Sequence, residues 1–363
     1  MNAQNDGPYD AILYLSFGGP EGADDVMPFL RNVVRGRNIP DERLLGVAKH
    51  YMHFGGVSPI NAQNREVIAA LEIELAENNI DLPVYFGNRN WHPMLTDTLQ
   101  TMKKAGVERV LSVVTSAFSS YSGCRQYREN ITAAQEQIVG GLEVDKLRVF
   151  YNHPLFIDAM ADRIQLAQQS LGTPIEETKL VFTAHSIPNS MAEGCSYESQ
   201  LKESARLVAD KLGWTNWSLC YQSRSGAPTQ PWLEPDICDY LAELAEARES
   251  VAESGASESG ASESGASESG VNNSVVVSPL GFLTDHMEVL FDLDIEAKEV
   301  CAANNLPFAR ASTVGAHPSY IRMLRLLIEE RLGRREPEAI GEHPPSHDVC
   351  PIDCCLLNAA NSK

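Results

Sequence analysis

The chain has 363 residues, enough for two domains with hydrophobic cores of their own, and a hydrophobic content of 43% typical of a globular protein. Its formal net charge of −20 argues against the broad basic surface that binds nucleic acid or anionic membranes. No apolar run reaches the length of about 18 residues that spans a bilayer. Because residues 1–8 lack the basic and apolar segments of a secretory signal, we expect a cytoplasmic protein.

Apolar strands alternate with amphipathic helices along the chain. In the first half, the patterns predict strands at 11–17, 82–86 and 110–114 and helices at 62–78 and 94–105. In the second half, they predict strands at 179–183, 217–221 and 274–278 and helices at 156–170, 198–212, 235–248 and 286–303. This alternation predicts an α/β fold of two similar doubly wound domains, each with a parallel sheet, and a cleft between them.

We expect an N-terminal domain at 8–150, a C-terminal domain at 151–335 and a tail at 336–363. An insert at 249–272 interrupts the C-terminal domain. Within it, residues 252–270 repeat a five-residue unit of Ala, Ser, Glu and Gly with nothing apolar larger than alanine. Such a segment cannot bury a core, so we predict a disordered, mildly acidic loop without chemistry of its own.

A histidine ends one of the predicted strands. In Leu180-Val-Phe-Thr-Ala-His185-Ser-Ile-Pro188, an apolar run stops at His185 and is followed by Ser and Pro. A lone histidine at such a point is more often structural than functional. Its place at the carboxyl end of a strand nevertheless puts it where α/β proteins bind their ligands.

The helix predicted at 286–303 carries a row of acids. Asp285 and His286 lie at its start, and Glu288, Asp292 and Glu296 follow at spacings of four, so the three carboxylates share one helix face. An acidic helix face is commonly just solvated. This one begins where a strand ends, and together with His185 it predicts a cleft that handles protons or binds a divalent metal ion.

Two of these segments resemble the active-site pair of a known family. Ala184-His185-Ser186-Ile187-Pro188 and Asp285-His286-Met287-Glu288 resemble motifs of ferrochelatases, which insert Fe²⁺ into a porphyrin to make haem. The resemblance covers nearly the whole chain outside the insert and includes further motifs in order: Leu15-Ser-Phe-Gly-Gly-Pro-Glu21, His53-Phe-Gly-Gly-Val-Ser-Pro-Ile60, Tyr85-Phe-Gly-Asn-Arg-Asn-Trp91, Tyr121-Ser-Gly-Cys-Arg-Gln-Tyr127 and Gln222-Ser-Arg-Ser-Gly226. The sequences of these motifs resemble those of the actinobacterial-type enzymes, which use coproporphyrin III rather than protoporphyrin IX.

The resemblance implies roles for single residues. His185 and Glu288 are the expected catalytic residues and ligands of the incoming Fe²⁺, and Ser58 and Tyr127 are expected to contact the porphyrin. Tyr127 could equally be a core residue. Weaker candidates for the porphyrin pocket are Tyr121, Arg31 and Arg35. Phe17 stands where some relatives have a Tyr that faces the metal, and Arg224 is either a propionate contact or, as we favour, a structural ion pair that closes the domains.

The sequence leaves open which of the two catalytic residues removes protons and which binds the metal. Neutral His185 can accept a pyrrole proton or bind iron. Glu288 can fix the tautomer of His185, bind the metal, or pass protons outward through Asp292 and Glu296.

The chain has eight cysteines, and three of them, Cys350, Cys354 and Cys355, cluster in the tail. In a cytoplasmic protein such a cluster indicates a metal site rather than disulfides. Some ferrochelatases hold a 2Fe–2S cluster with three C-terminal cysteines and one internal cysteine, and the resemblance implies Cys124 as the fourth thiolate. Because side chains alternate along an extended chain, adjacent cysteines fit one centre poorly, so Cys195 is a substitute ligand. The other alternative is a disordered tail with idle thiols.

Three other functions compete with ferrochelatase activity. They are a haem or tetrapyrrole carrier without turnover, a cobalt or nickel chelatase of the same fold, and an iron–sulfur electron-transfer protein. The last needs a flavin or nicotinamide partner site, and Gly18-Gly19-Pro20 after the first strand lacks the glycine pattern of dinucleotide binding.

Overall fold

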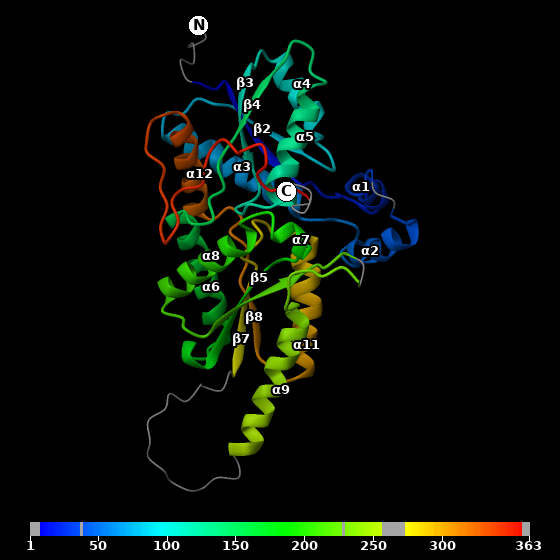
Figure 1. Ribbon diagram of the computed structural model, residues 1–363, viewed down its shortest axis with the longest axis vertical. Coiled ribbons are helices and arrows are strands. Elements are labelled where there is room, and N and C mark those ends of the chain that lie inside the picture. The colour runs from blue at the N-terminus through cyan, green and yellow to red at the C-terminus, as the bar shows by residue number, and fades with distance from the viewer. Residues whose placement is uncertain (1–7, 37–38, 227–228, 256–272, 358–363) are drawn as a thin grey trace.

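The computed structural model describes residues 8–36, 39–226, 229–255 and 273–357. Its two halves lie one above the other along the longest axis (Figure 1), and each half contains a four-stranded parallel sheet. The first sheet has the order β2-β1-β3-β4 and the second the order β6-β5-β7-β8, so the two halves repeat one topology. The predicted fold of two doubly wound α/β units is therefore confirmed.

The strands of the first sheet are β1 (Ala11–Ser16), β2 (Val84–Asn88), β3 (Arg109–Val114) and β4 (Glu143–Lys146). Those of the second are β5 (Thr178–His185), β6 (Trp217–Gln222), β7 (Ser274–Ser278) and β8 (Phe308–Arg310). Every residue of β1 and β7 is buried. Strands covered by helices on both faces are expected to be apolar throughout, and this explains why they were recognised from sequence.

Alternate residues of β1 face different helices. Leu13 and Leu15 belong to a core with α4 (Leu95–Lys104) and α5 (Gln126–Gln135), whereas Ile12 and Tyr14 belong to a core with α3 (Ile60–Glu77). That second core continues into the other half through α6 (Pro154–Leu171), α8 (Tyr197–Leu212) and α12 (Pro318–Arg331). The opposite face of the second sheet is covered by α9 (Ile237–Gly255) and by η4 (Leu290–Ala297) with α11 (Lys298–Ala303).

The last helix, α12, joins the two halves. It packs against α3 of the first half and α6 of the second, and Figure 1 shows it beside α3. Ion pairs reinforce the contact: Arg325 Nε lies 2.7 Å from Glu74 Oε1, and Arg331 Nη2 lies 3.0 Å from Asp145 Oδ2. The division of the chain into domains at 8–150 and 151–335 stays a prediction. Helix α12 contacts residues on both sides of that boundary.

Sequence reasoning did not predict α1 (Val26–Val33), α2 (Asp41–His53), α5, α12 or the edge strands β4 and β8. The single helix predicted at 286–303 consists of α10 (Met287–Val289), the π-helix η4 and α11. Within the described ranges no helix has the length and apolarity needed to cross a membrane.

The predicted disorder of the insert at 249–272 is wrong for its first residues. Residues 249–255 continue α9, because neither glycine nor proline interrupts the chain between 237 and 254. The rest of the insert, 256–272, lies outside the described residues.

Candidate active site

His185 is the last residue of β5 and lies at the carboxyl edge of the second sheet. Its Nδ1 is 2.5 Å from the carbonyl oxygen of Ser186. A carbonyl oxygen only accepts hydrogen bonds, so Nδ1 is the nitrogen that carries the proton in the neutral ring. Nε2 is left with a lone pair, and the side chain is 34% exposed. His185 is thus set up as a base or as a metal ligand.

Glu288 faces that lone pair from α10. Its Oε2 lies 3.8 Å from His185 Nε2, and its side chain is 47% exposed. The two segments meet because the loop after β7 passes directly against β5. A Cβ on Gly281 would lie 2.7 Å from the Cα of Ala184, so only glycine permits this approach. The structure therefore brings the two predicted catalytic residues together.

Asp292 lies next along the acidic row, inside the π-helix η4. Its Oδ2 accepts hydrogen bonds from Ser223 Oγ and from Gln222 Nε2, the latter at 3.2 Å. Burial raises the pKa of Asp292 to about 7, and burial also raises the pKa of Glu296. The row thus leads from exposed Glu288 to a carboxyl group that changes its charge near neutral pH.

The two residues before the helix have structural partners. Asp285 Oδ1 accepts a hydrogen bond of 2.7 Å from Arg310, whose guanidinium also binds Asp294. His286 Nδ1 accepts from the backbone N–H of Glu288 at 3.2 Å, and burial lowers the pKa of His286. These contacts fix the start of the helix and so position Glu288. Sequence reasoning missed Arg310, which no local pattern marks.

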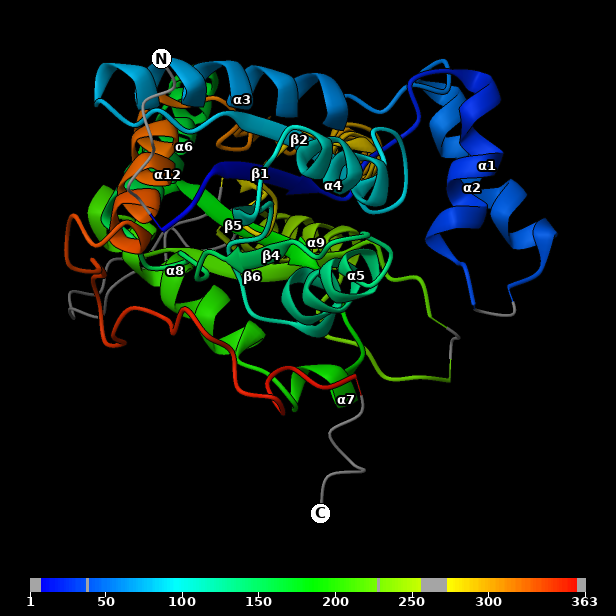
Figure 2. The same ribbon diagram turned by 90° about the horizontal axis from the view of Figure 1, so that it is seen from above.

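Helix α2 of the first half contacts the helical segment at this edge of the second sheet. The ring of His50 stacks on Phe291 of η4, with centroids 3.8 Å apart and planes within 7°. Burial and the nearby charge of Glu288 raise the pKa of Tyr51. Figure 2 shows α1 and α2 standing apart from the sheets at one side of the molecule. The residues of α2 that reach the site were not predicted, because their partners come from the distant half of the chain.

The predicted arginines have hydrogen-bond or ion-pair partners of their own, and a role for them toward a porphyrin stays a prediction. Arg31 pairs with Asp41 at 3.2 Å, and Arg35 donates to Asn32 Oδ1 at 2.5 Å. Arg224 donates to the carbonyl of Gln230 at 2.9 Å. A contact between the halves in this region comes from Arg43 of α2, which donates to the carbonyls of Ser225 and Gly226.

Both predicted porphyrin contacts are packed inside the first half. Ser58 is 4% exposed, and its backbone N–H donates to Pro20 O at 2.8 Å. Tyr127 is also 4% exposed, and the guanidinium of Arg89 lies 4.4 Å from its ring centroid and 5.6 Å from that of Phe17. Tyr121 donates to Glu129 Oε2 at 3.0 Å. A role for these residues in a porphyrin pocket stays a prediction.

The described part of the tail is fastened to the body by hydrogen bonds rather than by a core. Arg125 Nη1 donates to the carbonyls of Ile352 at 2.8 Å and Cys354 at 2.9 Å, and Arg128 Nη1 donates to that of Cys350 at 3.2 Å. Arg125 ends the π-helix η2 (Tyr121–Arg125), which also carries Cys124. The tail is thereby held against the internal cysteine.

The four predicted cluster cysteines meet here. The thiols of Cys124 and Cys350 form a hydrogen bond, which lowers the pKa of Cys350 to about 7. The sulfurs of Cys354 and Cys355 are 3.4 Å apart. The expected difficulty with adjacent cysteines does not arise, since residues 352–355 form a turn and Cys355 has a φ of 56° instead of an extended conformation.

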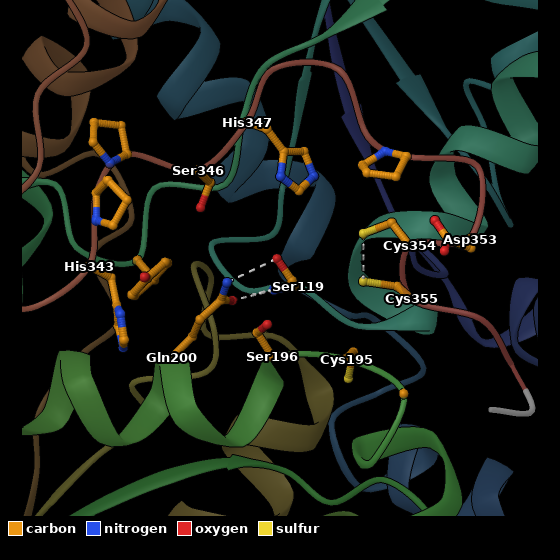
Figure 3. Close-up of a pocket in the computed structure, with 15 residues that line it drawn as sticks. Ser119, Cys195, Ser196, Gln200, His343, Ser346, His347, Asp353, Cys354 and Cys355 are labelled. Atoms are coloured by element: carbon orange, nitrogen blue, oxygen red, sulfur yellow. Dashed lines mark hydrogen bonds between the residues drawn. The ribbon is translucent and has the colours of Figure 1, made fainter. Parts of the chain in front are cut away.

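The cysteine site borders a cavity of about 620 Å³ between the tail and the segment before α8 (Figure 3). Cys195 lines this cavity with Cys354 and Cys355, so the substitute ligand is also close. His347, which sequence reasoning missed, lines it too. The ligand atoms of His347, Cys350 and Cys354 all lie within 4.8 Å of one another. The spacing His-x₂-Cys-x₃-Cys is the signal that could have identified it.

Comparisons with known proteins agree with the motifs. The family model described as Ferrochelatase matches residues 9–253 and 264–332. The chain is 54% identical to the ferrochelatase of Rhodopirellula baltica, over 96% of this chain and 94% of that protein. It is 46% identical to the coproporphyrin III ferrochelatase of Streptomyces coelicolor over 97% and 94% of the two chains, and 47% identical to that of Nocardia farcinica over 92% of each.

A solved structure shares the fold. SirB from Bacillus subtilis with Fe³⁺ superposes with a TM-score of 0.52 at 13% identity, covering 89% of this chain and 95% of that one. At this identity the likeness concerns the arrangement of strands and helices alone. The family model, by contrast, spans both sheets and the segments that carry His185 and Glu288. The chain belongs to the ferrochelatase family.

Proposed function

We propose that this protein inserts Fe²⁺ into a porphyrin, as an enzyme of haem biosynthesis that acts in the cytoplasm. The observation that carries the proposal is the facing pair of His185 Nε2 and Glu288 Oε2, 3.8 Å apart at the sheet edge. Coproporphyrin III is the favoured porphyrin. Support for it comes from relatives that bear this substrate in their names at 46% and 47% identity.

The geometry suits both tasks of metallation. Bonds from imidazole and carboxylate to a divalent ion of this kind are about 2.1 Å long, so atoms 3.8 Å apart can bind one ion between them. Alternatively, Nε2 of His185 can accept a proton from a pyrrole N–H, because Nδ1 already holds the ring's own proton against Ser186 O. In that case Glu288 stabilises the imidazolium that forms.

Protons that leave the macrocycle need an onward acceptor. Asp292 has a pKa of about 7 and so can take up and release a proton at neutral pH. It lies one step beyond Glu288, and Glu296 continues the row toward the surface. We propose this row as the outward route for protons.

We further propose that Cys124, Cys350, Cys354 and Cys355 hold a 2Fe–2S cluster. The donor set fits, since four thiols converge, and the hydrogen bond with Cys124, followed by the charges of Lys146 and Arg128, lowers the pKa of Cys350, which favours its thiolate form. A bound cluster supplies a one-electron redox centre and a cross-link between tail and first half. The chain's contribution is the preformed docking of the tail by Arg125 and Arg128.

The test is anaerobic metal insertion by the purified protein, with coproporphyrin III and protoporphyrin IX assayed side by side. We expect Fe²⁺ to be inserted into coproporphyrin III. If protoporphyrin IX is also metallated, its reaction should be the slower of the two. Insertion of Co²⁺ or Ni²⁺ without Fe²⁺ would favour another chelatase of this fold. A faster reaction with protoporphyrin IX would refute the substrate preference and leave the reaction standing.

A further inference from the structure

We propose that His347, Cys350 and Cys354, with Cys124 as fourth donor, form a mononuclear site for a borderline divalent cation such as Zn²⁺ or Fe²⁺. The inference rests on the proposed function and concerns the tail before a cluster is assembled, because a single ion and a cluster cannot occupy the three shared cysteines at the same time. It differs from the cluster in its last donor, which is His347 rather than Cys355.

The three tail donors already converge on one point. Their ligand atoms lie within 4.8 Å of one another. On a tetrahedral ion with bonds of about 2.0–2.3 Å, neighbouring ligand atoms are about 3.3–3.8 Å apart. The donors need to move by only about 1 Å to bind the same ion, which a turn on the protein surface allows.

The fourth donor comes from the body of the protein. Cys124 lies on η2 and is 5% exposed, and its thiol is hydrogen-bonded to that of Cys350. It is therefore within reach of an ion bound to Cys350. Three thiolates and one imidazole in a tetrahedral arrangement select Zn²⁺ and similar ions over the hard cations Mg²⁺ and Ca²⁺.

Cys355 lies beside Cys354 but is not among the three tail donors whose ligand atoms converge. It has a φ of 56°, is 3% exposed, and its sulfur contacts that of Cys354. A cluster with two irons needs two pairs of thiolates and therefore needs Cys355, whereas a single ion does not. The two metal forms are thus separable by mutation.

The surroundings suit a centre with three thiolates. Arg125 and Arg128 donate hydrogen bonds to the carbonyls of Cys354 and Cys350, which hold the tail donors beside η2. In Figure 3 the ring of His347 projects from the tail toward the same cavity that Cys354 lines. That cavity provides the entry path that a metal site requires.

Co²⁺ titration of metal-free, sulfide-free protein under anaerobic conditions tests the site. Co²⁺ bound by thiolates shows a near-ultraviolet charge-transfer band, which a His185–Glu288 site without sulfur does not produce. We expect His347→Ala to weaken this binding at least about tenfold, a loss no smaller than that of an outer-shell partner. Cys355→Ser and His343→Ala, the latter a second histidine lining the cavity, should bind as tightly as the wild type.

A further variant separates ligation from folding. His347→Cys should restore tight binding and strengthen the charge-transfer band, because a fourth thiolate replaces the imidazole. Absence of the band in wild-type protein, equal affinity of His347→Ala, or a loss in Cys355→Ser as large as in His347→Ala would each overturn the proposal.

Reconstitution with iron and sulfide distinguishes this inference from the proposed cluster. We expect Cys355→Ser to lose the visible absorption of the cluster and His347→Ala to keep it. If wild-type protein binds Co²⁺ through His347 but never assembles a cluster, the mononuclear site is supported and only the proposed cluster is refuted.

Discussion

His185 and Glu288 are oriented by backbone contacts rather than by each other. The carbonyl of Ser186 fixes the tautomer of His185, and the cap formed by His286 fixes the start of the helix that carries Glu288. Their side chains remain about one third and one half exposed. A pair held in this way keeps its geometry when one member is replaced, so single variants report on chemistry.

His185→Ala and Glu288→Gln should each lower the rate of Fe²⁺ insertion at least about 100-fold, the usual contribution of a positioned acid or base. Porphyrin affinity, measured by fluorescence quenching, should change little, because the binding surface of the porphyrin is much larger than either group. Glu299→Gln on the exposed face of α11 is the matched control and should behave as wild type. Near-normal turnover in either variant would remove that residue from the mechanism.

Asp292 makes stability depend on pH. Burial raises its pKa from 3.8 to about 7, so the folded state favours the protonated carboxyl. The stabilisation of the folded state by the protonated carboxyl is fully present below about pH 4 and is lost as the pH rises through 7. Asp292→Asn should therefore be more stable than wild type above pH 7, by up to about 4 kcal/mol at about 1.4 kcal/mol per pKa unit.

Urea unfolding at pH 5 and pH 8 measures this difference. The gap between variant and wild type should widen with pH. A gap that is the same at both pH values, or that narrows at pH 8, would show that the carboxyl of Asp292 is not held protonated by burial.

At the scale of elements, the sequence predicted what depends on local pattern. The apolar runs of β1, β5 and β7 and the periodicity of α3, α6 and α8 were sufficient, because burial on both faces leaves a continuous signal. The placement of His185 at the end of β5, and of Glu288 in the helical segment that follows β7, was predicted from the same pattern.

What sequence reasoning missed depends on contacts between distant segments. The π-helix η4 buries Leu293 and Ala297, whereas its apolar Phe291 stacks on His50 of α2. Helix α2 packs on α1, and the role of its His50 depends on Phe291 in the other half, which no local pattern reveals. The tail likewise has no core pattern, since side-chain to carbonyl bonds hold it.

The docking of the tail predicts a protease result. Arg125→Ala removes two hydrogen bonds from a charged donor to the carbonyls of Ile352 and Cys354, each contributing about 1.5 kcal/mol or more. The open form of the tail should become at least about tenfold more populated. Limited proteolysis with mass spectrometry should show faster cleavage near residue 350, whereas exposed Arg322→Ala on α12 should not change the rate.

Equal cleavage rates in Arg125→Ala and wild type would contradict this role. Faster cleavage in both variants would show that general destabilisation, and not the tail contact, is responsible.

At the scale of the whole molecule, two sheets of the same topology share one core through α3, α12 and α6. The arginines of α12 pair with acids of the first half, and Arg148 binds Glu330 at 2.8 Å with both side chains almost fully buried. This shared core and these ion pairs join two halves of the same sheet topology. From its composition we expect the repetitive insert to take no part in this core.

Replacing residues 256–270 with a short Gly/Ser turn should therefore leave the insertion rate and the melting temperature nearly unchanged, since the repeat has nothing to bury. Thermal unfolding and the metallation assay check this. A loss of more than about 2 kcal/mol, large for a surface change, would show that the repeat packs against the body.

The number of metallated porphyrins formed per chain tests the central claim most directly. Purified protein, excess Fe²⁺ and excess coproporphyrin III are mixed under strictly anaerobic conditions, and the product is counted spectroscopically against protein-free and Glu288→Gln controls. The account predicts many turnovers per chain, at a rate that falls to near the protein-free value in the variant. At most one metallated porphyrin per chain, or a rate unaffected by Glu288→Gln, would contradict it and indicate a tetrapyrrole carrier instead.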